Sequence, residues 1–407
     1  MSALSYSSLR RSPLVFLMVL AAVNVFGFAA WNALLNNFAK ESVSFTGADM
    51  GLLQSIREIP GLLAVTALIW LYLMREQTLA YVSLILLATG IAMTGLFPTH
   101  AGLWMTTFIM SVGFHYFETM NQSLALQLIP KAEAPKALGK ITAAASLAQL
   151  VAFGLIALVW STLQPGYTTL FLIVGGFAIA VTVAAIVVFP RFEGAVAQRK
   201  GLVLRKRYWL YYALTLMSGA RRQIFTAFGA FLLVETFKFD VSAIATLFLA
   251  TYGLNMVFAP RLGELIGLIG ERRTIMFENI SLIAVFIGYA LAAKGLIPYA
   301  SGFAAAFFVL DGVFFTFTIA QRTYFQKVAD PADIAPTAGV AFTINHIAAV
   351  FIPVLFGLIW LKDASLVFVI GAGIATISLS LAFLVPRHPT AGAETVLTGR
   401  GVARPAE

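Results

Sequence analysis

The stretch RKRYWLYYALTLMSGARRQIFTAFGAFLLVETF, residues 205–237, decides how the rest of the chain must fold. It opens with three basic residues and continues as an apolar segment that carries Arg221 and Arg222 near its middle. At about 1.5 Å per residue, these arginines lie roughly 20 Å along a helix, close to a bilayer midplane. A charge at that depth costs at least about 2.5–3.5 kcal/mol unless it is paired or faces water. We therefore expect this helix to face a polar central cavity, where at least one arginine meets an anionic group.

The composition indicates a polytopic membrane protein. Of the 407 residues, 60% are hydrophobic and only 11% are charged, whereas soluble domains contain about 25% charged residues. The chain has no cysteine, which excludes disulfides, thiolate metal sites and cysteine nucleophiles. A net charge of +9 is compatible with nucleic-acid binding, but the placement of the basic residues indicates membrane orientation and no nucleic-acid partner.

Hydropathy predicts an all-α polytopic fold with twelve transmembrane helices. The predicted spans are 14–36, 47–74, 78–97, 101–128, 138–163, 167–190, 208–236, 241–268, 273–293, 297–326, 335–361 and 365–386. A polar, basic segment, 191–207, is the predicted cytoplasmic linker between an N-terminal six-helix bundle, 14–190, and a C-terminal six-helix bundle, 208–386. We expect residues 1–13 to form a cytoplasmic N-terminus and 387–407 to form a disordered cytoplasmic tail.

Lysine and arginine give the expected orientation. With the N-terminus inside, sixteen of them fall in inner loops and only Lys40, Lys238, Lys294 and Lys362 fall in outer loops. Because inner loops of membrane proteins carry the excess of basic residues, we expect both termini in the cytoplasm. The expected location is the cell inner (plasma) membrane.

The two halves of the chain resemble each other weakly. A shift of 200 positions places Gly139 on Gly339 and Trp160 on Trp360, at matching ends of predicted helices. Parallel six-helix repeats joined by a long cytoplasmic loop are typical of one class of secondary transporter. The repeats predict two pseudo-symmetric bundles.

One loop carries a motif that points to a family. After the eighth predicted span the chain reads Arg261-Leu-Gly263-Glu264-Leu-Ile-Gly-Leu-Ile-Gly270-Glu271-Arg272-Arg273. With this loop and this layout, the chain resembles the major facilitator superfamily over residues 14–386. The equivalent first-half loop, 72–77, keeps little of the signature, and the fifth span lacks the Gly-Pro-rich motif of drug/proton antiporters. These departures lower the expectation of a multidrug exporter and leave the subfamily open.

The resemblance implies that the first, fourth, seventh and tenth helices line the central cavity. The candidate substrate-binding residues are Arg221, Arg222, Gln223, Asn32, Asn121, Gln122 and Gln321, with Asn345 from the eleventh span. Arginine binds a carboxylate, phosphate or sulfate through two parallel hydrogen bonds. Because adjacent helix positions point about 100° apart, we expect one arginine at the ligand and the other in a structural pair with Glu118 or Asp311.

Glu118 and Asp311 are the candidate proton-coupling residues, and His115 is a candidate proton relay. A carboxyl in a partly dry cavity can load and release protons near neutral pH, and histidine titrates in the same range. Permanent salt bridges are the alternative for the two carboxyls. The alternative for the histidine is a plain hydrogen-bonding role.

Two groups of charges are expected at the gates. Arg57 and Glu58 lie near the outer end of the second span, where an ion pair is favoured over contact with a ligand. At the inner side, the expected gate residues are Glu264, Arg272, Arg273 and Glu278.

The sequence thus predicts a monomeric secondary active transporter in the lipid bilayer. It would move a small anionic or zwitterionic organic solute by alternating access, with protons as the coupling ion. The sequence shows no phosphate-binding glycine loop and no His-Glu-x-x-His motif, so we expect no enzyme activity, no cofactor and no metal. Two alternatives stay open: a broad exporter of lipophilic compounds with structural arginines, and a non-transporting membrane scaffold or assembly protein of the same fold.

Overall fold

The computed structural model describes residues 12–63, 66–129, 134–192, 204–330 and 333–398. All regular secondary structure in these residues is helical, apart from an isolated bridge between Thr390 and Ala393. The predicted all-α fold is confirmed. The chain divides into two compact units: unit 1 comprises Met1–Phe45, Ile56–Gln198 and Phe239–Leu249, and unit 2 comprises Thr46–Ser55, Arg199–Lys238 and Ala250–Glu407.

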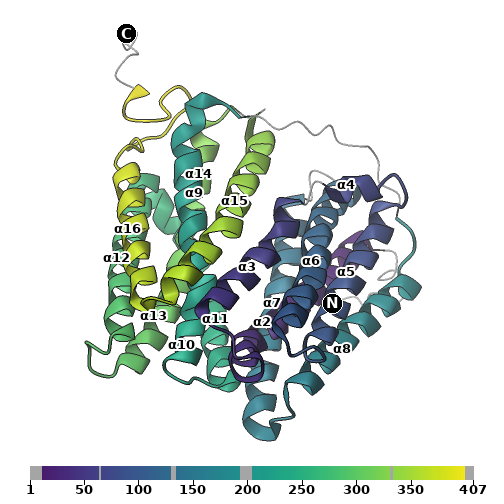
Figure 1. Cartoon of the computed structure of the whole chain (residues 1–407). Helices are drawn as coiled ribbons and strands as arrows, with labels where there is room; N and C mark the ends of the chain where they lie inside the picture. Colours follow the sequence, from purple (N-terminus) through teal and green to yellow (C-terminus); the bar gives the residue numbers. More distant parts are fainter. Residues whose placement is uncertain (1–11, 64–65, 130–133, 193–203, 331–332, 399–407) are drawn as a thin grey trace. The chain divides into compact units, whose positions relative to one another are not determined.

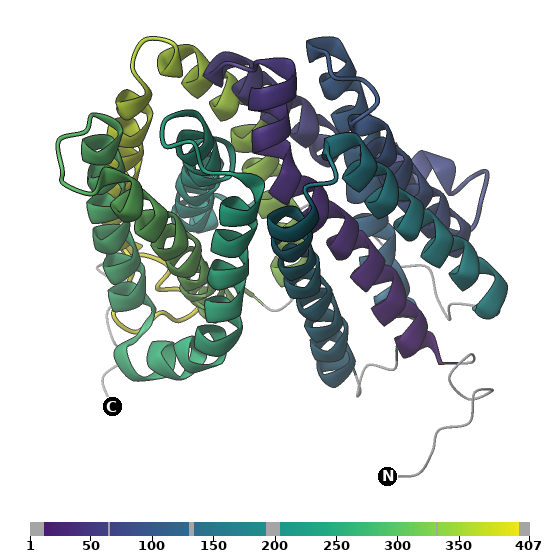
Figure 2. The same ribbon diagram turned by 90° about the horizontal axis from the view of Figure 1, so that it is seen from below.

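Unit 1 is built mainly from the helices drawn purple to blue-green in Figure 1. They are α2 (Pro13–Val43), α4 (Ala67–Trp70), α5 (Glu76–Thr94), α6 (His100–Leu128), α7 (Ala134–Leu163) and α8 (Tyr167–Val188), with parts of α3 (Gly47–Leu62) and α11 (Val241–Ile269). α2 begins where the Ser12 hydroxyl accepts a hydrogen bond from the amide of Val15. Pro13 fits the first turn because its missing N–H would be unpaired there anyway. Figure 2 shows α2 running alongside α7, and α5 packs against both α6 and α8.

Glycines allow α5 and α6 to approach closely. A Cβ atom at Gly113 of α6 would lie 2.3 Å from the backbone nitrogen of Leu87 and 2.4 Å from the carbonyl oxygen of Ser83. In the same way, a Cβ atom at Gly90 of α5 would lie 2.4 Å from the backbone nitrogen of Met110. The two backbones therefore touch, and unit 1 is held by direct helix contact in addition to its apolar core.

Unit 2 contains the helices drawn teal to yellow in Figure 1. They are η2 (Lys206–Tyr208), α9 (Trp209–Gln223), η3 (Ile224–Gly229), α10 (Ala230–Glu235), α12 (Glu271–Ala293), α13 (Ala300–Phe314), η4 (Phe315–Thr318), α14 (Ile319–Val328), α15 (Ile334–Trp360) and α16 (Ala364–Ala382). α12 packs against α13 and α16, and α9 packs against α15.

Two membrane helices of unit 2 are irregular in the middle. The seventh predicted span changes from α9 into the π-helical segment η3 and then into α10, while the tenth changes from α13 into the 3₁₀ segment η4 and then into α14. The Asn255 side chain supports the second irregularity, because it donates to the carbonyl oxygen of Gly312 (3.1 Å) and accepts from the Thr316 hydroxyl (2.9 Å). Interruptions of this kind inside helices often mark functional positions.

Nine described helices are long and apolar enough to cross a membrane. They coincide with nine of the twelve predicted spans, and the other three predicted spans are also helical: α3 with α4, α6, and α9 with η3 and α10. As single helices, these three are not both long and apolar enough to cross a membrane, because each is short, polar or interrupted. On α7 the side chains of Leu147, Val151, Leu155 and Leu158 are exposed along one face. An outward apolar surface of this kind is suited to lipid, so this is a multi-pass membrane protein.

The described part of the predicted linker is anchored at its end. The guanidinium of Arg205 donates through Nε and Nη2 to the carboxylate of Asp333, with an Nη2–Oδ1 distance of 2.9 Å. The Tyr208 hydroxyl donates to the same carboxylate, at 2.9 Å. These hydrogen bonds, from Arg205 above all, lower the pKa of Asp333 from 3.8 to about 2. Linker residues 193–203 lie outside the described residues.

The chain after α16 continues with defined contacts as far as residue 398. The Tyr324 hydroxyl donates to the backbone carbonyl of Glu394, and the amide of Val396 donates to the carbonyl of Leu384 at 2.9 Å. The segment predicted to be disordered from 387 onward is therefore ordered in this part. The polar composition of this segment predicts disorder, because composition gives no indication of Thr395 or of the backbone hydrogen bonds that hold the segment in place.

The contact between α5 and α6 predicts that unit 1 tolerates no side chain at Gly113. Gly113→Ala should lower the free energy of unfolding by about 1–3 kcal/mol, because backbone atoms must move apart. The matched control is Gly154→Ala, where a Cβ atom would meet nothing within 4 Å and alanine favours the helix. Thermal unfolding of the purified protein in detergent measures both changes, and equal melting temperatures for the two variants would contradict the close contact.

The anchoring of Asp333 predicts a stability contribution that depends on pH. Because the folded-state pKa is below the ordinary value, the contribution is complete above about pH 5 and is lost as the pH falls toward 2. Asp333→Asn should therefore lower the melting temperature at pH 7 and have a smaller effect at pH 3, where about half of the charge contribution remains. The control is Asp240→Asn, which preserves the cap that Asp240 provides to Ala243. A deficit of Asp333→Asn that is the same at both pH values would exclude the charge as its cause.

Candidate functional site

A buried ion pair occupies the middle of unit 2. Nη2 of Arg221, near the end of α9, lies 2.7 Å from Oε1 of Glu278 on α12, and the two side chains are 3% and 0% exposed. The Arg221 Nη2 also lies 3.4 Å from the hydroxyl of Ser218, one turn earlier on the same helix. Arg221 is therefore held within the protein by a charge-assisted hydrogen bond. The sequence grouped Glu278 with Arg272 and Arg273 at a gate, and the structure instead makes it the partner of Arg221.

A second carboxyl lies close to this ion pair. Asp311 of α13 is 3% exposed and interacts electrostatically with both Arg221 and Glu278. Its Oδ2 atom, Oε2 of Glu278 and the hydroxyl of Tyr289 are all buried without a hydrogen-bond partner among the described residues. One guanidinium thus serves two buried carboxyls.

The neighbouring positions of α9 have a different environment. Arg222 is half-buried, and its Nε atom has no hydrogen-bond partner among the described residues. Gln223 is fully buried, and neither its amide nitrogen nor its amide oxygen is paired within the described part of the chain. The π-helical segment begins at the next residue, Ile224. The two arginines therefore differ: Arg221 is in an internal pair, with Glu278 in place of the expected Glu118 or Asp311, and Arg222 has a donor without a partner among the described residues.

α15 brings further polar side chains to the same unit. Oδ1 of Asn345 lies 2.5 Å from the position that a Cβ atom would take at Gly219 of α9, so a side chain there would require the Asn345 amide to move. Nδ1 of His346 lies 2.9 Å from the carbonyl oxygen of Phe342. Gln321 of α14 is buried as well. Asn345 is thus adjacent to the helix that carries the arginines.

Unit 1 contains a cavity of about 240 Å³ between α2, α6 and α7. Its lining residues are Ala21, Asn24, Val25, Phe117, Glu118, Asn121, Ile141, Thr142, Ala145, Ser146 and Gln149. Two of the predicted site residues, Glu118 and Asn121, lie in this cavity. The sequence analysis did not select Thr142, Ser146 and Gln149. Their spacing of four and three residues in an otherwise apolar helix is the signal that could have found them.

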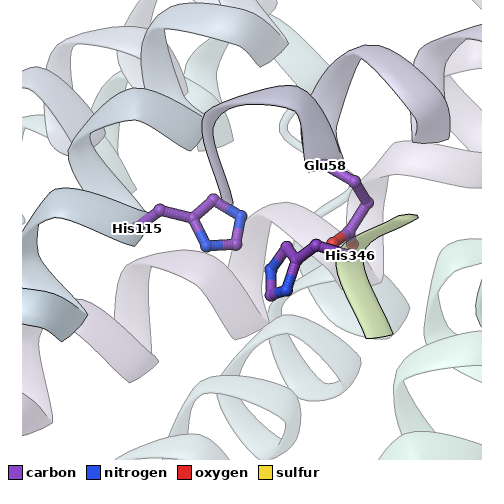
Figure 3. Close-up of side chains that lie close together, drawn as sticks. All are labelled: Glu58, His115 and His346. Carbon is purple, nitrogen blue, oxygen red and sulfur yellow. The ribbon is translucent and has the colours of Figure 1, made fainter. Parts of the chain in front are cut away.

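A second polar group in unit 1 surrounds an ion pair on α3. Nη2 of Arg57 lies 2.6 Å from Oε1 of Glu58, both side chains are buried, and the guanidinium lies 5.7 Å from the ring centre of Phe28. The Ser111 hydroxyl of α6 donates to the backbone carbonyl of Arg57. Figure 3 shows Glu58 and His115, which bring a carboxylate oxygen and a ring nitrogen within 4.8 Å of each other. His346, also labelled there, belongs to α15 in unit 2.

The other predicted site residues lie apart from these groups. Gln122, Glu264 and Arg273 are exposed, and Asn32 is half-buried on α2. Arg272 places its guanidinium 5.9 Å from the ring centre of Phe383. Near the start of α12 the observed ion pair joins Glu271 to Lys327, at 2.5 Å. Glu278 is therefore the only residue of the predicted inner-gate group with an ion pair among the described residues, and that pair is to Arg221.

A model of the major facilitator superfamily matches residues 14–353. The chain belongs to this superfamily. The match confirms the resemblance seen in the loop motif around Gly270. A comparison with curated protein sequences gave no match.

Solved structures of major facilitator transporters share the fold. A variant of the nucleoside transporter NupG has a TM-score of 0.75 at 14% identity, over 91% of this chain and 99% of the other. A bacterial homologue of the human lysosomal transporter Spinster, in an inward-facing and occupied conformation, has a TM-score of 0.71 at 14% identity, over 92% and 96%. A POT family transporter in complex with 5-aminolevulinic acid has a TM-score of 0.68 at 11% identity, over 91% and 94%. At these identities the likeness shows a transporter fold and leaves the solute open.

The internal pairing of Arg221 predicts a loss of stability when it is removed. Arg221→Ala leaves two buried carboxyls without a cation and should cost up to about 3–5 kcal/mol of unfolding free energy. Combining Arg221→Met with Glu278→Gln should recover part of this loss, because the uncompensated charge is reduced. Arg222→Ala, one residue away, is the matched control and should cost less than about 1 kcal/mol. Unfolding in detergent compares the four proteins, and an equal loss for Arg221→Ala and Arg222→Ala would contradict the pairing.

Proposed function

We propose that this major facilitator protein is a secondary active transporter that moves a small anionic or zwitterionic organic solute together with protons. The observation that supports proton coupling is the single guanidinium of Arg221 beside the two buried carboxyls of Glu278 and Asp311. With both carboxyls ionised, this group would carry a net charge of −1 in an apolar surrounding. Binding one proton removes that charge, and releasing it restores the charge, so the group can couple proton movement to a conformational cycle.

Arg222 is the proposed contact for the anionic part of the solute. Its side chain is half-buried and has a buried Nε atom with no partner among the described residues. A guanidinium binds a carboxylate through two hydrogen bonds, and charge-assisted hydrogen bonds contribute about 1.5–3 kcal/mol. Gln223 and Asn345 are proposed to add neutral hydrogen bonds in the same unit. Asn32, Gln122 and Gln321 are further candidates from the sequence.

The proposed placement is the cell inner membrane with both termini in the cytoplasm. The excess of Lys and Arg in alternate loops supports this orientation. In this orientation Arg205, Arg207 and Asp333 lie on the cytoplasmic side of the membrane. The ion pair between Lys294 and Asp363, with an Nζ–Oδ2 distance of 3.2 Å, lies on the outer side. Arg57 with Glu58, and Glu264 with Arg272 and Arg273, remain proposed gate residues.

The first test identifies the solute and the role of Arg222. Thermal unfolding of the purified protein is measured against a panel of organic anions, amino acids, nucleosides and lipophilic cations, since a specific ligand raises the melting temperature. Arg222→Ala should raise the dissociation constant of a stabilising anion or zwitterion by about 10- to 100-fold, as expected for a lost charge-assisted hydrogen bond. The control variant is Arg222→Lys, which keeps the positive charge but cannot form the two parallel hydrogen bonds of a guanidinium. Stabilisation by lipophilic cations alone would favour the exporter, and stabilisation by no compound would favour the scaffold.

A second test separates proton coupling from solute binding. In proteoliposomes, Asp311→Asn should keep the exchange of labelled for unlabelled solute and lose accumulation driven by a pH gradient, because one proton-binding group is gone. Glu41→Gln, an exposed substitution that keeps an oxygen acceptor for the Tyr167 hydroxyl, should retain both activities. Accumulation by Asp311→Asn at the wild-type level would remove Asp311 from the coupling step.

A further inference from the structure

The irregular turn in the tenth predicted span starts close to Asp311. α13 ends at Phe314, and the 3₁₀ segment η4 occupies Phe315–Thr318 before α14 begins. A 3₁₀ segment pairs residues three apart, whereas an α-helix pairs residues four apart, so carbonyl oxygens near the change need other donors. The carbonyl of Gly312, the residue after Asp311, lies within one turn of this change. A group that binds this carbonyl therefore also fixes the backbone beside Asp311.

The side chain of Asn255, on α11, binds this turn at two points. Its Nδ2 atom donates to the carbonyl oxygen of Gly312 at 3.1 Å, and its Oδ1 atom accepts from the Thr316 hydroxyl at 2.9 Å. A carbonyl oxygen cannot donate, so the amide nitrogen must face Gly312. The Thr316 hydroxyl also lies 2.7 Å from the carbonyl oxygen of Val313. Asn255 thus offers this hydroxyl an acceptor outside its own helix.

α11 also packs closely against the turn at the same place. A Cβ atom at Gly312 would lie 2.3 Å from Cγ2 of Thr251, so any side chain there would displace Thr251. Thr251 and Asn255 are four residues apart on α11, and Gly312 and Thr316 are four residues apart across the turn, so each pair lies on one face. α11 therefore meets the backbone after Asp311 by packing and by hydrogen bonding, at positions one helical turn apart.

The same glycine lies against the other irregular segment of unit 2. Cζ of Phe225, in η3, is 3.4 Å from the position that a Cβ atom would take at Gly312, and the ring of Phe225 lies 4.7 Å from that of Phe308. Gly312 thus contacts both α11 and η3, and these contacts limit the positions that Asp311 can take.

The groups that act electrostatically on Asp311 come from two helices. They are Arg221 of α9, and Glu278 and Tyr289 of α12. η3 and η4 contain no titratable residue, and the charged residues of α11 and α14 are exposed. Glu235 of α10 lies about 21 Å along the helix from Arg221, at 1.5 Å per residue. Because the interaction between charges falls with distance, the position of the Asp311 carboxyl decides how strongly Arg221 and Glu278 act on it.

We propose that Asn255 is a positioning residue for the proton-coupling group: it holds the turn after Asp311 and thereby sets the place of the Asp311 carboxyl beside Arg221 and Glu278. The inference rests on the proposed function for the role of Asp311, and it adds a helix, α11, that contributes no charge to the group. An amide that only stabilised the interruption of the helix would affect folding and leave the titration of Asp311 unchanged.

The test follows the protonation of Asp311 directly, by infrared spectroscopy of the full-length protein in detergent between about pH 4 and pH 10. The carboxyl band of Asp311 is the band that Asp311→Asn lacks. Asn255→Leu keeps the side-chain volume and removes both hydrogen bonds, so it should shift the midpoint of this band by at least about 0.5 pH unit, or about threefold in proton affinity. Thr316→Val removes only the hydroxyl contact and should shift the midpoint in the same direction by less.

Thr246→Val is the matched control, because the exposed Thr246 hydroxyl donates to the carbonyl of Ser242 in its own helix, α11, at 2.8 Å. This variant should titrate with the wild-type midpoint. A wild-type midpoint in Asn255→Leu would overturn the inference, even with faster amide hydrogen exchange in residues 312–318, because Asn255 would then be structural only. A different result, in which the wild type has no band that Asp311→Asn removes, would refute proton binding at Asp311 and the inference with it.

Discussion

A guanidinium buried in an apolar surrounding must have an anion beside it, and Arg221 meets this requirement inside its own unit. Its partner, Glu278, comes from α12, so the ion pair joins α9 to the helix that also packs against α13 and α16. Removing two charges from water is expensive, and the cost is recovered only by close geometry and further hydrogen bonds. At 2.7 Å the pair has that geometry. The hydrogen bonds are incomplete, since Oε2 of Glu278 and Oδ2 of Asp311 have no partner among the described residues.

This incomplete satisfaction is the feature on which the proposed proton coupling rests. A permanent salt bridge that only stabilised the bundle would need one carboxylate for one guanidinium. Unit 2 instead places a second buried carboxyl, Asp311, next to the pair, which leaves one negative charge too many unless a proton binds. The neighbouring Arg222 is free of this group and differs from Arg221 in burial and in pairing. Adjacent identical residues thus have different environments because consecutive helix positions point in different directions.

The sequence allowed prediction of the family, the all-helical fold and the special position of the Arg221-Arg222 pair, because these depend on composition and on the cost of charge in lipid. It did not predict the partner of Arg221. Glu278 lies near Arg272 and Arg273 in the chain, and proximity in sequence suggested a gate, whereas helix packing alone decides that it meets α9. The residues that line the cavity in unit 1 were predicted only in part. Glu118 and Asn121 were predicted as site residues because they are polar and lie on a helix that was expected to line the central cavity. Gln149 was not predicted, because it lies on α7, which the family resemblance did not include among the lining helices. The order of residues 387–398 was missed because polar, glycine-containing sequence also forms turns that are fixed by backbone hydrogen bonds.

The two units also differ in how much their helices can change shape. In unit 1 the backbones of α5 and α6 touch at Gly90 and Gly113, and such contact allows little internal movement. In unit 2 the irregular segment η3 starts directly after the Arg221-Arg222-Gln223 sequence, and η4 starts a few residues after Asp311. Irregular backbone changes its hydrogen bonding at lower cost than a regular helix does. A change in the charge of Glu278 or Asp311 changes the attraction that holds Arg221 at the end of α9, and the adjacent π-helical segment is where α9 and α10 can respond. The position of the irregular backbone, beside the charged group, is what the proposed coupling of proton binding to helix movement requires.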